Sequence, residues 1–221
     1  MDISLLKYPK KSHRKKIILP SESVALAELM GIILGDGGIN NGWQLIVTVN
    51  SIADLAYSGY VKSLLENLFG IQVVTRKKKI GNALDIISSS TSLVDFVVSK
   101  GAVRGNKVAQ KIDIPNWIKG NEEYEKHCVR GLVDTDGCLY IHRHTVAGKK
   151  YRNIGFNFSS MSKPLIYSVS IILKKFDIEP HITPDYSQIY LYSQKAVVDY
   201  LGIFGSSNPR ITNKYKEWRG A

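Results

Sequence analysis

Two aspartates stand out because each ends a similar nine-residue stretch and is followed by glycine. The stretches Leu29–Gly37 (LMGIILGDG) and Val129–Gly137 (VRGLVDTDG) repeat at a spacing of 100 residues. They place Asp36 and Asp136 at equivalent positions, at the C-terminus of an expected helix, where the partial negative charge of the helix disfavours an anion. Divalent cations with oxygen ligands would compensate for this placement. The pair therefore predicts a metal centre.

Each stretch also carries small residues at four-residue spacing, which would leave one side of a helix almost bare. Ala27, Gly31 and Gly35 form this stripe in the first copy, and Gly131 with Thr135 forms it in the second. Glycine costs about 1 kcal/mol in a helix relative to alanine. The stripes therefore predict two helices whose backbones nearly touch. The backbone carbonyl groups of Gly35 and Thr135 could join the metal ligands.

Packing the stripes together would bring the two carboxylates close to each other. At a separation of about 4 Å their repulsion would be roughly 1–4 kcal/mol, depending on screening. Metals shared by the two groups would remove this cost. Such metals can activate a water molecule and stabilise the leaving oxygen of a phosphodiester. The constellation therefore predicts phosphodiester hydrolysis.

Further echoes show that the repeat extends beyond the nonapeptides. Leu68–Ile71 (LFGI) has a counterpart in Lys175–Ile178 (KFDI), and Val94–Phe96 (VDF) has one in Val198–Tyr200 (VDY). The echoes keep their order with slightly different offsets, as drifting loops would produce. A duplicated unit of about 100 residues explains this pattern.

The expected order of elements in each unit is helix, hairpin, helix, hairpin, helix, which is an α+β arrangement. In the first unit we expect helices over 23–35, 52–69 and 92–100, a short strand at 39, a turn at 40–42, and strands over 43–50, 71–79 and 83–89. In the second we expect helices over 122–135, 163–176 and 195–204, and strands over 138–144, 152–159, 179–183 and 188–192. The predicted organisation is a basic arm (1–20), a first half (21–100), a linker (101–121) and a second half (122–221).

Two of the expected strands alternate between apolar and polar residues. In 43–50 the odd-numbered residues are apolar, and in 152–159 Ile154, Phe156 and Phe158 share one face. The opposite face is more polar and could read the edges of DNA bases. The same alternation is expected of any half-buried antiparallel sheet, so it permits DNA reading without showing it.

The charge of the chain favours a polyanionic partner. The net charge is +11 with a pI near 9.5, a balance that is common among proteins that bind nucleic acids. Basic residues cluster in the segment Lys7–Lys16, in Arg76–Lys79, and in an expected loop that joins Arg143 to Arg152. Such clusters could bind the phosphates of a nucleic acid. The alternative interpretation is that they are ordinary solvated loops.

Several classes of protein are disfavoured. No apolar run approaches the roughly 18 residues of a membrane span. The start, MDISLLKYPKKSHRKK, has its basic residues after a short apolar stretch, the reverse of a signal peptide. Cys128 and Cys138 lack the spacing of a disulfide framework. We therefore expect a reduced intracellular protein, without distinguishing the cytoplasm from an organelle matrix.

The two motifs, at this spacing in a small basic chain, resemble those of the single-chain LAGLIDADG homing endonucleases. The resemblance covers nearly the whole chain, because the elements after each motif match the αββαββα unit of that family. It implies pseudo-twofold symmetry, with two antiparallel sheets that form a saddle over the major groove of DNA. It also implies a monomer that cuts both strands of its DNA target with Mg²⁺ and leaves short 3′ overhangs. Mn²⁺ or Ca²⁺ would substitute in binding.

The resemblance assigns roles to single residues. Asp36 and Asp136 would be metal ligands. Leu34 departs from the motif, which has an aspartate there, as Asp134 shows in the second copy. Met30 and Arg130 replace a small residue and would alter the packing of the helices.

Further roles lie around the metals and along the strands. Asn50 and Ser159 would order water around the metals, and Lys107 and Arg210 would approach the phosphates that are cut. The residues expected to contact DNA are Gln44, Thr48, Arg76, Lys78, Arg143, Asn153, Asn157, Gln188, Tyr190 and Tyr192.

Three alternatives compete with this interpretation. A non-cleaving protein on the same fold, either a maturase that binds intron RNA or a DNA-binding regulator, is the main rival. An intein is less favoured, because the chain lacks a nucleophilic first residue and a terminal His-Asn. Zinc is disfavoured because the relevant side chains fit no common zinc spacing. These side chains are His127, Cys128, Cys138, His142 and His144.

Overall fold

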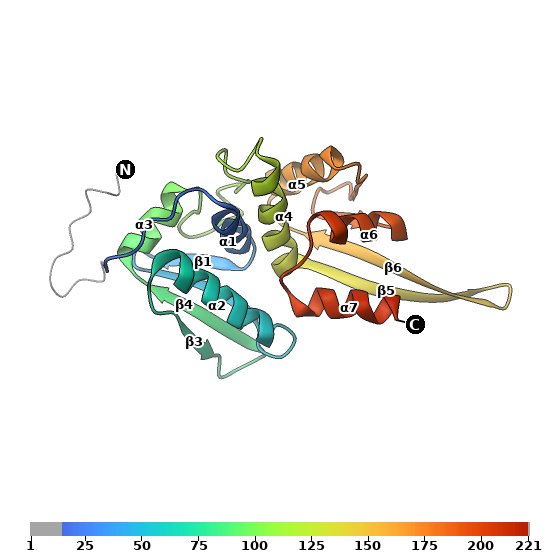
Figure 1. The fold of residues 1–221 in the computed structure, drawn as a ribbon, viewed down its shortest axis with the longest axis horizontal. Helices are drawn as coiled ribbons and strands as arrows, with labels where there is room; N and C mark the ends of the chain where they lie inside the picture. The colour runs from blue at the N-terminus through green and yellow to red at the C-terminus, as the bar shows by residue number, and fades with distance from the viewer. Residues whose placement is uncertain (1–14, 221) are drawn as a thin grey trace.

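The computed structural model describes residues 15–220 and consists of two halves of the same design (Figure 1). The first half contains α1 (Val24–Gly35), β1 (Gly37–Asn41), β2 (Gln44–Asn50), α2 (Leu55–Phe69), β3 (Val74–Lys77), β4 (Ala83–Ser89) and α3 (Thr91–Ser99). The second contains α4 (Glu122–Asp136), β5 (Gly137–Val146), β6 (Lys149–Ser159), α5 (Lys163–Lys175), β7 (His181–Ile182), β8 (Gln188–Leu191), α6 (Gln194–Ile203) and α7 (Pro209–Arg219). The duplicated αββαββα order is therefore confirmed. Most of the predicted basic arm, residues 1–14, lies outside the described residues.

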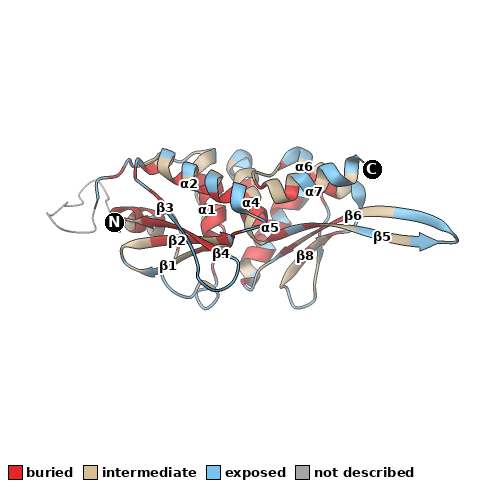
Figure 2. Cartoon of the chain, turned by 90° about the horizontal axis from the view of Figure 1, so that it is seen from below, coloured by how far each residue is buried: buried red, intermediate tan, exposed pale blue. Residues whose placement is uncertain are grey.

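Each half forms one four-stranded antiparallel sheet, and the two sheets have equivalent strand orders. The orders are β1-β2-β4-β3 and β5-β6-β8-β7. Helices cover one side of the sheets and leave the other side open (Figure 2). The alternation of β2 follows this arrangement, since Leu45, Val47 and Val49 are buried in the core. Within residues 15–220, none of the helices has the length and apolar character needed to cross a membrane.

The two motif helices, α1 and α4, pack side by side at the centre of the molecule (Figure 1). A methyl group added to Gly31 would lie 2.1 Å from the carbonyl oxygen of Cys128. One added to Gly131 would lie 2.3 Å from the carbonyl oxygen of Glu28. The predicted small-residue stripes are therefore confirmed, and the two helices touch backbone to backbone.

An ion pair joins the same two helices. Glu28 of α1, only 2% exposed, contacts the guanidinium of Arg130 in α4. Its carboxylate also accepts hydrogen bonds from Tyr60 Oη (2.8 Å) and Ser207 Oγ (2.7 Å). Arg130, expected to alter the helix packing, thus contributes an ion pair to the interface. Met30 is fully buried in the core.

The hairpin β5–β6 is much longer than predicted. The basic segment expected to be a loop instead continues both strands, which pair from Gly137 with Phe158 out to Val146 with Lys149. Ala147 and Gly148 form the turn with φ angles of 48° and 77°, the positive values that a two-residue hairpin requires. The hairpin projects beyond the helices as an arm (Figure 1). In the first half, by contrast, the hairpin turn lies at Gly42–Trp43, so Asn40 and Asn41 belong to β1 and not to the predicted turn over 40–42.

Helix α7 was not predicted. Of its eleven residues only Ile211 is buried, and Tyr215 and Trp218 pack partly buried against the core at helical spacing from it. These three apolar residues lie among polar and charged ones, so the helix has only a short and weak apolar pattern. Its start does carry a signal, because Asn208 caps the helix and Pro209 occupies the first turn. The predicted linker contains turns, and it buries Ile112, Ile114 and Ile118.

The close approach of α1 and α4 can be tested with two alanine substitutions. We expect Gly31→Ala to destabilise the protein by about 1–3 kcal/mol, because its methyl group would meet a backbone carbonyl that cannot rotate away. Gly59 lies within α2 with no atom inside 4 Å of an added methyl group. Gly59→Ala should therefore stabilise by about 0.5–1 kcal/mol through helix propensity. Urea unfolding measures both, and equal effects of the two changes would contradict the close packing.

Candidate active site

Asp36 and Asp136 lie where α1 and α4 end, at the open side of the central helix pair. A methyl group added to Gly35 would meet Thr135 Oγ1 at 2.1 Å and Asp136 Oδ2 at 2.9 Å, so the second carboxylate lies against the end of α1. Burial and the charge of Asp136 raise the pKa of Asp36 to about 7. Burial raises the pKa of Asp136 to about 6, and the charge of Lys107 opposes this rise. The structure therefore brings the two predicted carboxylates together.

Lys107 caps the C-terminus of α1. Its Nζ donates to the carbonyl oxygens of Ile33 (3.3 Å) and Leu34 (3.0 Å), and it also contacts that of Gly35. The last carbonyls of a helix have few backbone partners, although Ile33 O also accepts from the N–H of Asp36, and a cation there opposes the helix dipole. Burial lowers the pKa of Lys107, while the charges of Asp136 and Asp36 raise it. The Gly35 carbonyl, predicted to bind metal, is thus occupied by the ammonium group.

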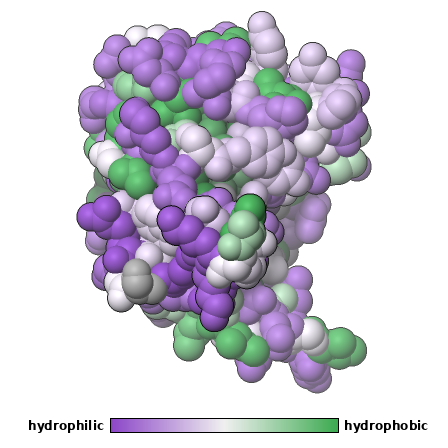
Figure 3. Space-filling model, turned by 90° about the vertical axis from the view of Figure 1, so that its right-hand side faces the viewer, coloured by the Kyte–Doolittle hydropathy of each residue, from purple (hydrophilic) through white to green (hydrophobic). Residues whose placement is uncertain are grey.

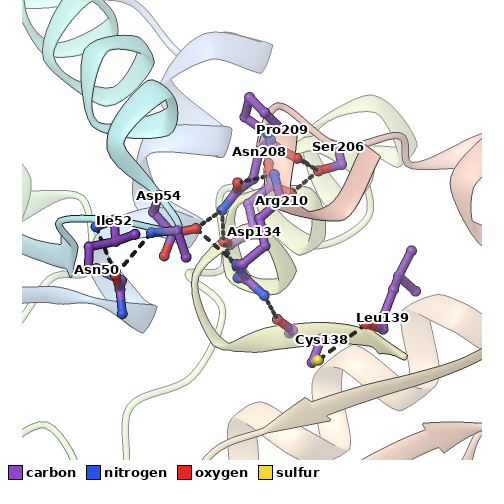
Figure 4. Close-up of polar contacts among 12 residues, drawn as sticks. Asn50, Ile52, Asp54, Asp134, Cys138, Leu139, Ser206, Asn208, Pro209 and Arg210 are labelled. Atoms are coloured by element: carbon purple, nitrogen blue, oxygen red, sulfur yellow. Dashed lines mark hydrogen bonds and ion pairs between the residues drawn. The ribbon is translucent and has the colours of Figure 1, made fainter. Parts of the chain in front are cut away.

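Arg210 has the equivalent place at the C-terminus of α4 (Figure 4). Its Nη1 donates to the carbonyl oxygen of Gly137 (3.0 Å) and its Nη2 to that of Asp134 (3.3 Å). Its Nε donates to Asp54 Oδ1 at 2.9 Å. The two cations predicted from the sequence are therefore both beside the motif helices, and each closes the end of one helix.

Asp134 has a structural role that its place in the motif did not reveal. Its side chain is 1% exposed and accepts hydrogen bonds from Ser206 Oγ (2.5 Å) and Ser207 N (2.7 Å). Burial raises the pKa of this carboxyl to about 7, although these hydrogen bonds lower it. Asp134 thereby fixes the loop that leads to Arg210. The first half has Leu34 at this position and cannot form the same contact.

The cations and aspartates combine crosswise between the halves. Lys107, which follows the first half, lines a hollow together with Asp136 and Ser159 of the second half. Arg210 belongs to the second half, yet its charge acts on Asp36 of the first, as does the larger effect of Lys107, which acts on both aspartates. Each half-site is therefore built from residues of both halves.

Asn50 and Ser159 differ in how close they come to their aspartates. They are equivalent in the sheets, because Asn50 pairs with Ala83 and Ser159 with Gln188 at matching places in β4 and β8. The first hairpins have different registers, however, since Gly37 pairs with Val47 and Gly137 with Phe158. In the second half, Ser159 is therefore the strand residue next to Asp136. In the first half, Thr48 has the corresponding place next to Asp36, and the backbone N of Thr48 donates to Asp36 O at 3.2 Å.

The side chain of Asn50 instead forms hydrogen bonds with the backbone. Its Oδ1 accepts hydrogen bonds from Ile52 N (2.9 Å) and Ala53 N (3.0 Å) in the turn before α2 (Figure 4). This contact orients the carboxamide oxygen toward the turn. The predicted equivalence of Asn50 and Ser159 therefore holds for the sheets but not for the approach to the carboxylates.

The open face of the first sheet carries a cluster that centres on Asp85, which was not predicted. Its carboxylate accepts from Thr48 Oγ1 (2.8 Å) and pairs with Arg76 (3.3 Å) and Lys78 (3.4 Å). Burial raises the pKa of Asp85, but the hydrogen bonds from Thr48 and Arg76 and the Lys78 charge hold it below its usual value. Nearby, Gln44 Nε2 donates to Ser89 Oγ at 3.2 Å. The cluster brings predicted DNA contacts of two strands together around an anion.

The open face of the second sheet presents amides and aromatic rings. Gln188 Oε1 accepts from Asn157 Nδ2 (3.1 Å) and Tyr190 Oη (2.5 Å). Tyr190 and Tyr192 are stacked, with ring centroids 5.4 Å apart. Asn153 Oδ1 accepts from Gln194 Nε2 at 2.5 Å. The end of the molecule to which the arm points is largely hydrophilic (Figure 3).

Arg143 does not share this face with the other predicted DNA contacts. It pairs with Arg152 in the hairpin, on the face that α7 covers. Arg152 donates to the carbonyl oxygens of Glu217 (2.8 Å) and Trp218 (3.1 Å), and Arg143 lies 3.6 Å from Glu217 Oε1. The strand continues through the segment that was read as a loop, and its alternation turns Arg143 toward the helix.

The raised pKa values predict how the stability of the metal-free protein depends on pH. The folded-state values of about 7 for Asp36 and about 6 for Asp136 exceed the ordinary 3.8, so the folded chain binds these protons more tightly than the unfolded chain. The contribution of these two carboxyl groups to stability is therefore greatest below about pH 4 and is lost as the pH rises through 6 and 7.

The double variant Asp36→Asn, Asp136→Asn removes this dependence. With metal chelated at pH 8, it should exceed the wild type in stability by on the order of 3 kcal/mol. Asp134, with its pKa of about 7, titrates in both proteins and cancels in the comparison. Urea unfolding between pH 4 and 8 measures the difference, and a gap that does not grow with pH would contradict the assignment.

Comparisons with known proteins agree with this architecture. Residues 123–214 match the family model of the LAGLIDADG-like domain. The chain is similar to the I-LtrWI LAGLIDADG homing endonuclease bound to target DNA, with a TM-score of 0.59, 9% identity and 89% of each chain covered. It is also similar to I-DmoI in complex with DNA and Ca, with a TM-score of 0.58, 17% identity, and 90% of this chain and 100% of that chain covered.

One curated relative is similar in sequence. The replication factor C small subunit of Methanocaldococcus jannaschii is 29% identical over 178 residues, which are 71% of this chain but 9% of that protein. This chain therefore spans only a small part of the relative that it matches. The C-terminal half carries a LAGLIDADG-like domain, and the chain as a whole has the two-unit fold of the LAGLIDADG homing endonucleases.

Proposed function

We propose that the chain is a site-specific homing endonuclease that uses Mg²⁺ to break both strands of a long DNA target, leaving short 3′ overhangs. The observation that carries this proposal is the pair of carboxylates at the meeting ends of α1 and α4. Burial raises both of their pKa values, the charge of Asp136 raises that of Asp36 further, and basic side chains lie beside them. A structural role alone does not require two such carboxylates at helix C-termini.

The residues present fit a hard divalent cation. Asp36 and Asp136 supply carboxylate oxygens, and Thr135 offers a backbone carbonyl nearby. Within residues 15–220 there is no group of three or more His, Cys, Asp and Glu side chains that could hold a metal. Mg²⁺ suits such a sparse set, because it keeps several waters and binds one or two carboxylates together with substrate phosphates. When bound, it would lower the pKa of a water molecule and stabilise the leaving oxygen.

The chain's own residues provide charge and position. Lys107 and Arg210 are fixed on helix-end carbonyls, so each presents positive charge beside one aspartate without reorganisation. Ser159, next to Asp136, has a hydroxyl that can orient a water molecule. The two half-sites supply one aspartate and one cation for each DNA strand, and Ser159 adds its hydroxyl in one of them.

The open sheet faces and the net charge of +11 support double-stranded DNA as the partner. The side chains on these faces are positioned by neighbouring side chains, and such order favours selective reading of base edges. I-LtrWI, of similar fold, was solved with its target DNA. We propose that this protein acts as a monomer inside the cell.

The rival is a non-cleaving protein on the same fold, a DNA-binding regulator or a maturase that binds intron RNA. The fold is also similar to full-length DUF199/WhiA from Thermatoga maritima, with a TM-score of 0.53, 17% identity, and 90% of this chain and 62% of that chain covered. Catalysis separates these functions. If the wild-type protein cut no DNA in the presence of Mg²⁺ but bound intron RNA tightly, the proposed endonuclease function would be rejected.

Substituting the aspartates tests the proposed chemistry. A randomised plasmid library, incubated with protein and Mg²⁺, would yield the target through its linear products. On that target, Asp36→Asn or Asp136→Asn should abolish double-strand cleavage and leave DNA binding within a few-fold. Asp199→Asn is the matched control, because Asp199 pairs with Lys195 on α6 and lies outside the site. Cleavage at the wild-type rate by either site variant would refute shared-metal catalysis.

Metal binding can be measured without DNA. At pH 8 both carboxylates are ionised, so Mg²⁺ should raise the melting temperature of the wild type. The double variant Asp36→Asn, Asp136→Asn should show no such rise. At pH 5, where protons occupy the site, the wild-type response should also disappear. An equal rise in both proteins at pH 8 would place the metal elsewhere.

A further inference from the structure

Asp54 lies at the N-cap of α2 but does not cap its helix. An aspartate at this position usually accepts a hydrogen bond from the backbone of the first turn. Asp54 makes no such bond, and its backbone angles are φ −112° and ψ 20°. Its carboxylate is directed across the molecule toward the second half (Figure 4).

The carboxylate of Asp54 holds two residues at the start of α7. Oδ1 accepts from Arg210 Nε at 2.9 Å and from Asn208 Nδ2 at 2.8 Å. Asn208 is fully buried, and its Nδ2 also donates to Asp134 O at 2.9 Å. Its Oδ1 accepts from the backbone N of Arg210 at 2.9 Å. Asp54 is therefore tied to both the side chain and the local backbone of Arg210.

These contacts fix the orientation of the guanidinium group. Each of its three nitrogen atoms donates one hydrogen bond, to Asp54, to Gly137 O and to Asp134 O. A guanidinium has five N–H groups, so two remain for an incoming anion. Asp54 and Arg210 are also both within electrostatic reach of Asp36.

The other half-site has no equivalent of Asp54. In the described part of the chain, the Lys107 ammonium group donates only to backbone carbonyl oxygens. The segment that precedes α5, Ser160–Pro164, contains no acidic residue. There Ser162 Oγ donates to Ile112 O at 2.5 Å. One cation is thus held by a carboxylate from the opposite half, and the other is not.

We propose that Asp54 is a positioning residue that orients Arg210 in the half-site of Asp36 and so sets the rate at which one of the two DNA strands is cut. This inference rests on the proposed endonuclease function. A misplacement of about 1 Å in a catalytic group can cost about 100-fold in rate, so the loss of one anchor is large enough to measure.

The test uses a target duplex with a different fluorophore on each strand, cut under single-turnover conditions. Asp54→Ala should slow one strand by about 10- to 100-fold and leave the other within about twofold. The affected strand should be the one that Arg210→Ala slows. Asp54→Asn keeps an acceptor oxygen and should have a smaller effect. DNA affinity should stay unchanged, and Asp199→Asn again serves as the control.

A double-substitution cycle shows whether Asp54 acts through Arg210. In the Arg210→Ala background, Asp54→Ala should cause no further slowing, because the group it positions is absent. Full additivity of the two effects would overturn the inference. Equal slowing of both strands, or no slowing of either, would overturn it as well.

The contact itself can be observed without cleavage. In ¹⁵N NMR spectra the Arg210 Nε–H signal, assigned by its loss in Arg210→Lys, should be sharp and slow to exchange in the wild type, and fast in Asp54→Ala. Fast hydrogen exchange of the Arg210 Nε–H in the wild type would contradict the contact with Asp54. A wild type that cuts both strands but shows no strand-specific effect rejects this inference alone. A wild type that cuts no DNA rejects the endonuclease function and, with it, the effect on strand rate.

Discussion

The contact between α1 and α4 is the constraint on which the rest of the structure depends. Gly31 and Gly131 bring the two backbones together, since an added methyl group would lie 2.1 Å and 2.3 Å, respectively, from a carbonyl oxygen across the interface. Such proximity forces Asp36 and Asp136 into one small region and buries them in part. Their raised pKa values are a direct result of the packing, because burial is the largest cause for both. The Glu28–Arg130 ion pair fixes the same two helices farther along.

The helix ends create a second requirement, which the basic residues meet. Both motif helices point their C-terminal carbonyls toward the carboxylates, so that region has a surplus of negative charge. Lys107 reduces this surplus of negative charge at the C-terminus of α1, and Arg210 reduces it at the C-terminus of α4. The loop that carries Arg210 is itself anchored on Asp134. Burial, helix dipoles and counter-charges are therefore parts of one electrostatic arrangement.

The sequence predicted what local spacing and repetition encode, and it missed what long-range contacts decide. The glycine stripes, the repeated units and the paired aspartates follow from residues a few positions apart. Helix α7 has only three apolar residues at helical spacing, and the β5–β6 arm is rich in charged residues, so the sequence predicts neither the helix nor the full length of the arm. Asp54 contacts residues more than 150 positions away, and the expected helix over 52–69 gives no indication of these partners. The different registers of the two first hairpins separate Asn50 from Asp36, and no residue type signals that shift.

The crosswise half-sites have a mechanical consequence. Lys107 faces an aspartate of the opposite half, and so does Arg210. A rotation of one half relative to the other would thus change the surroundings of both aspartates at once. A difference between the two half-sites has its source in individual side chains, such as the Asp54 carboxylate that holds Arg210.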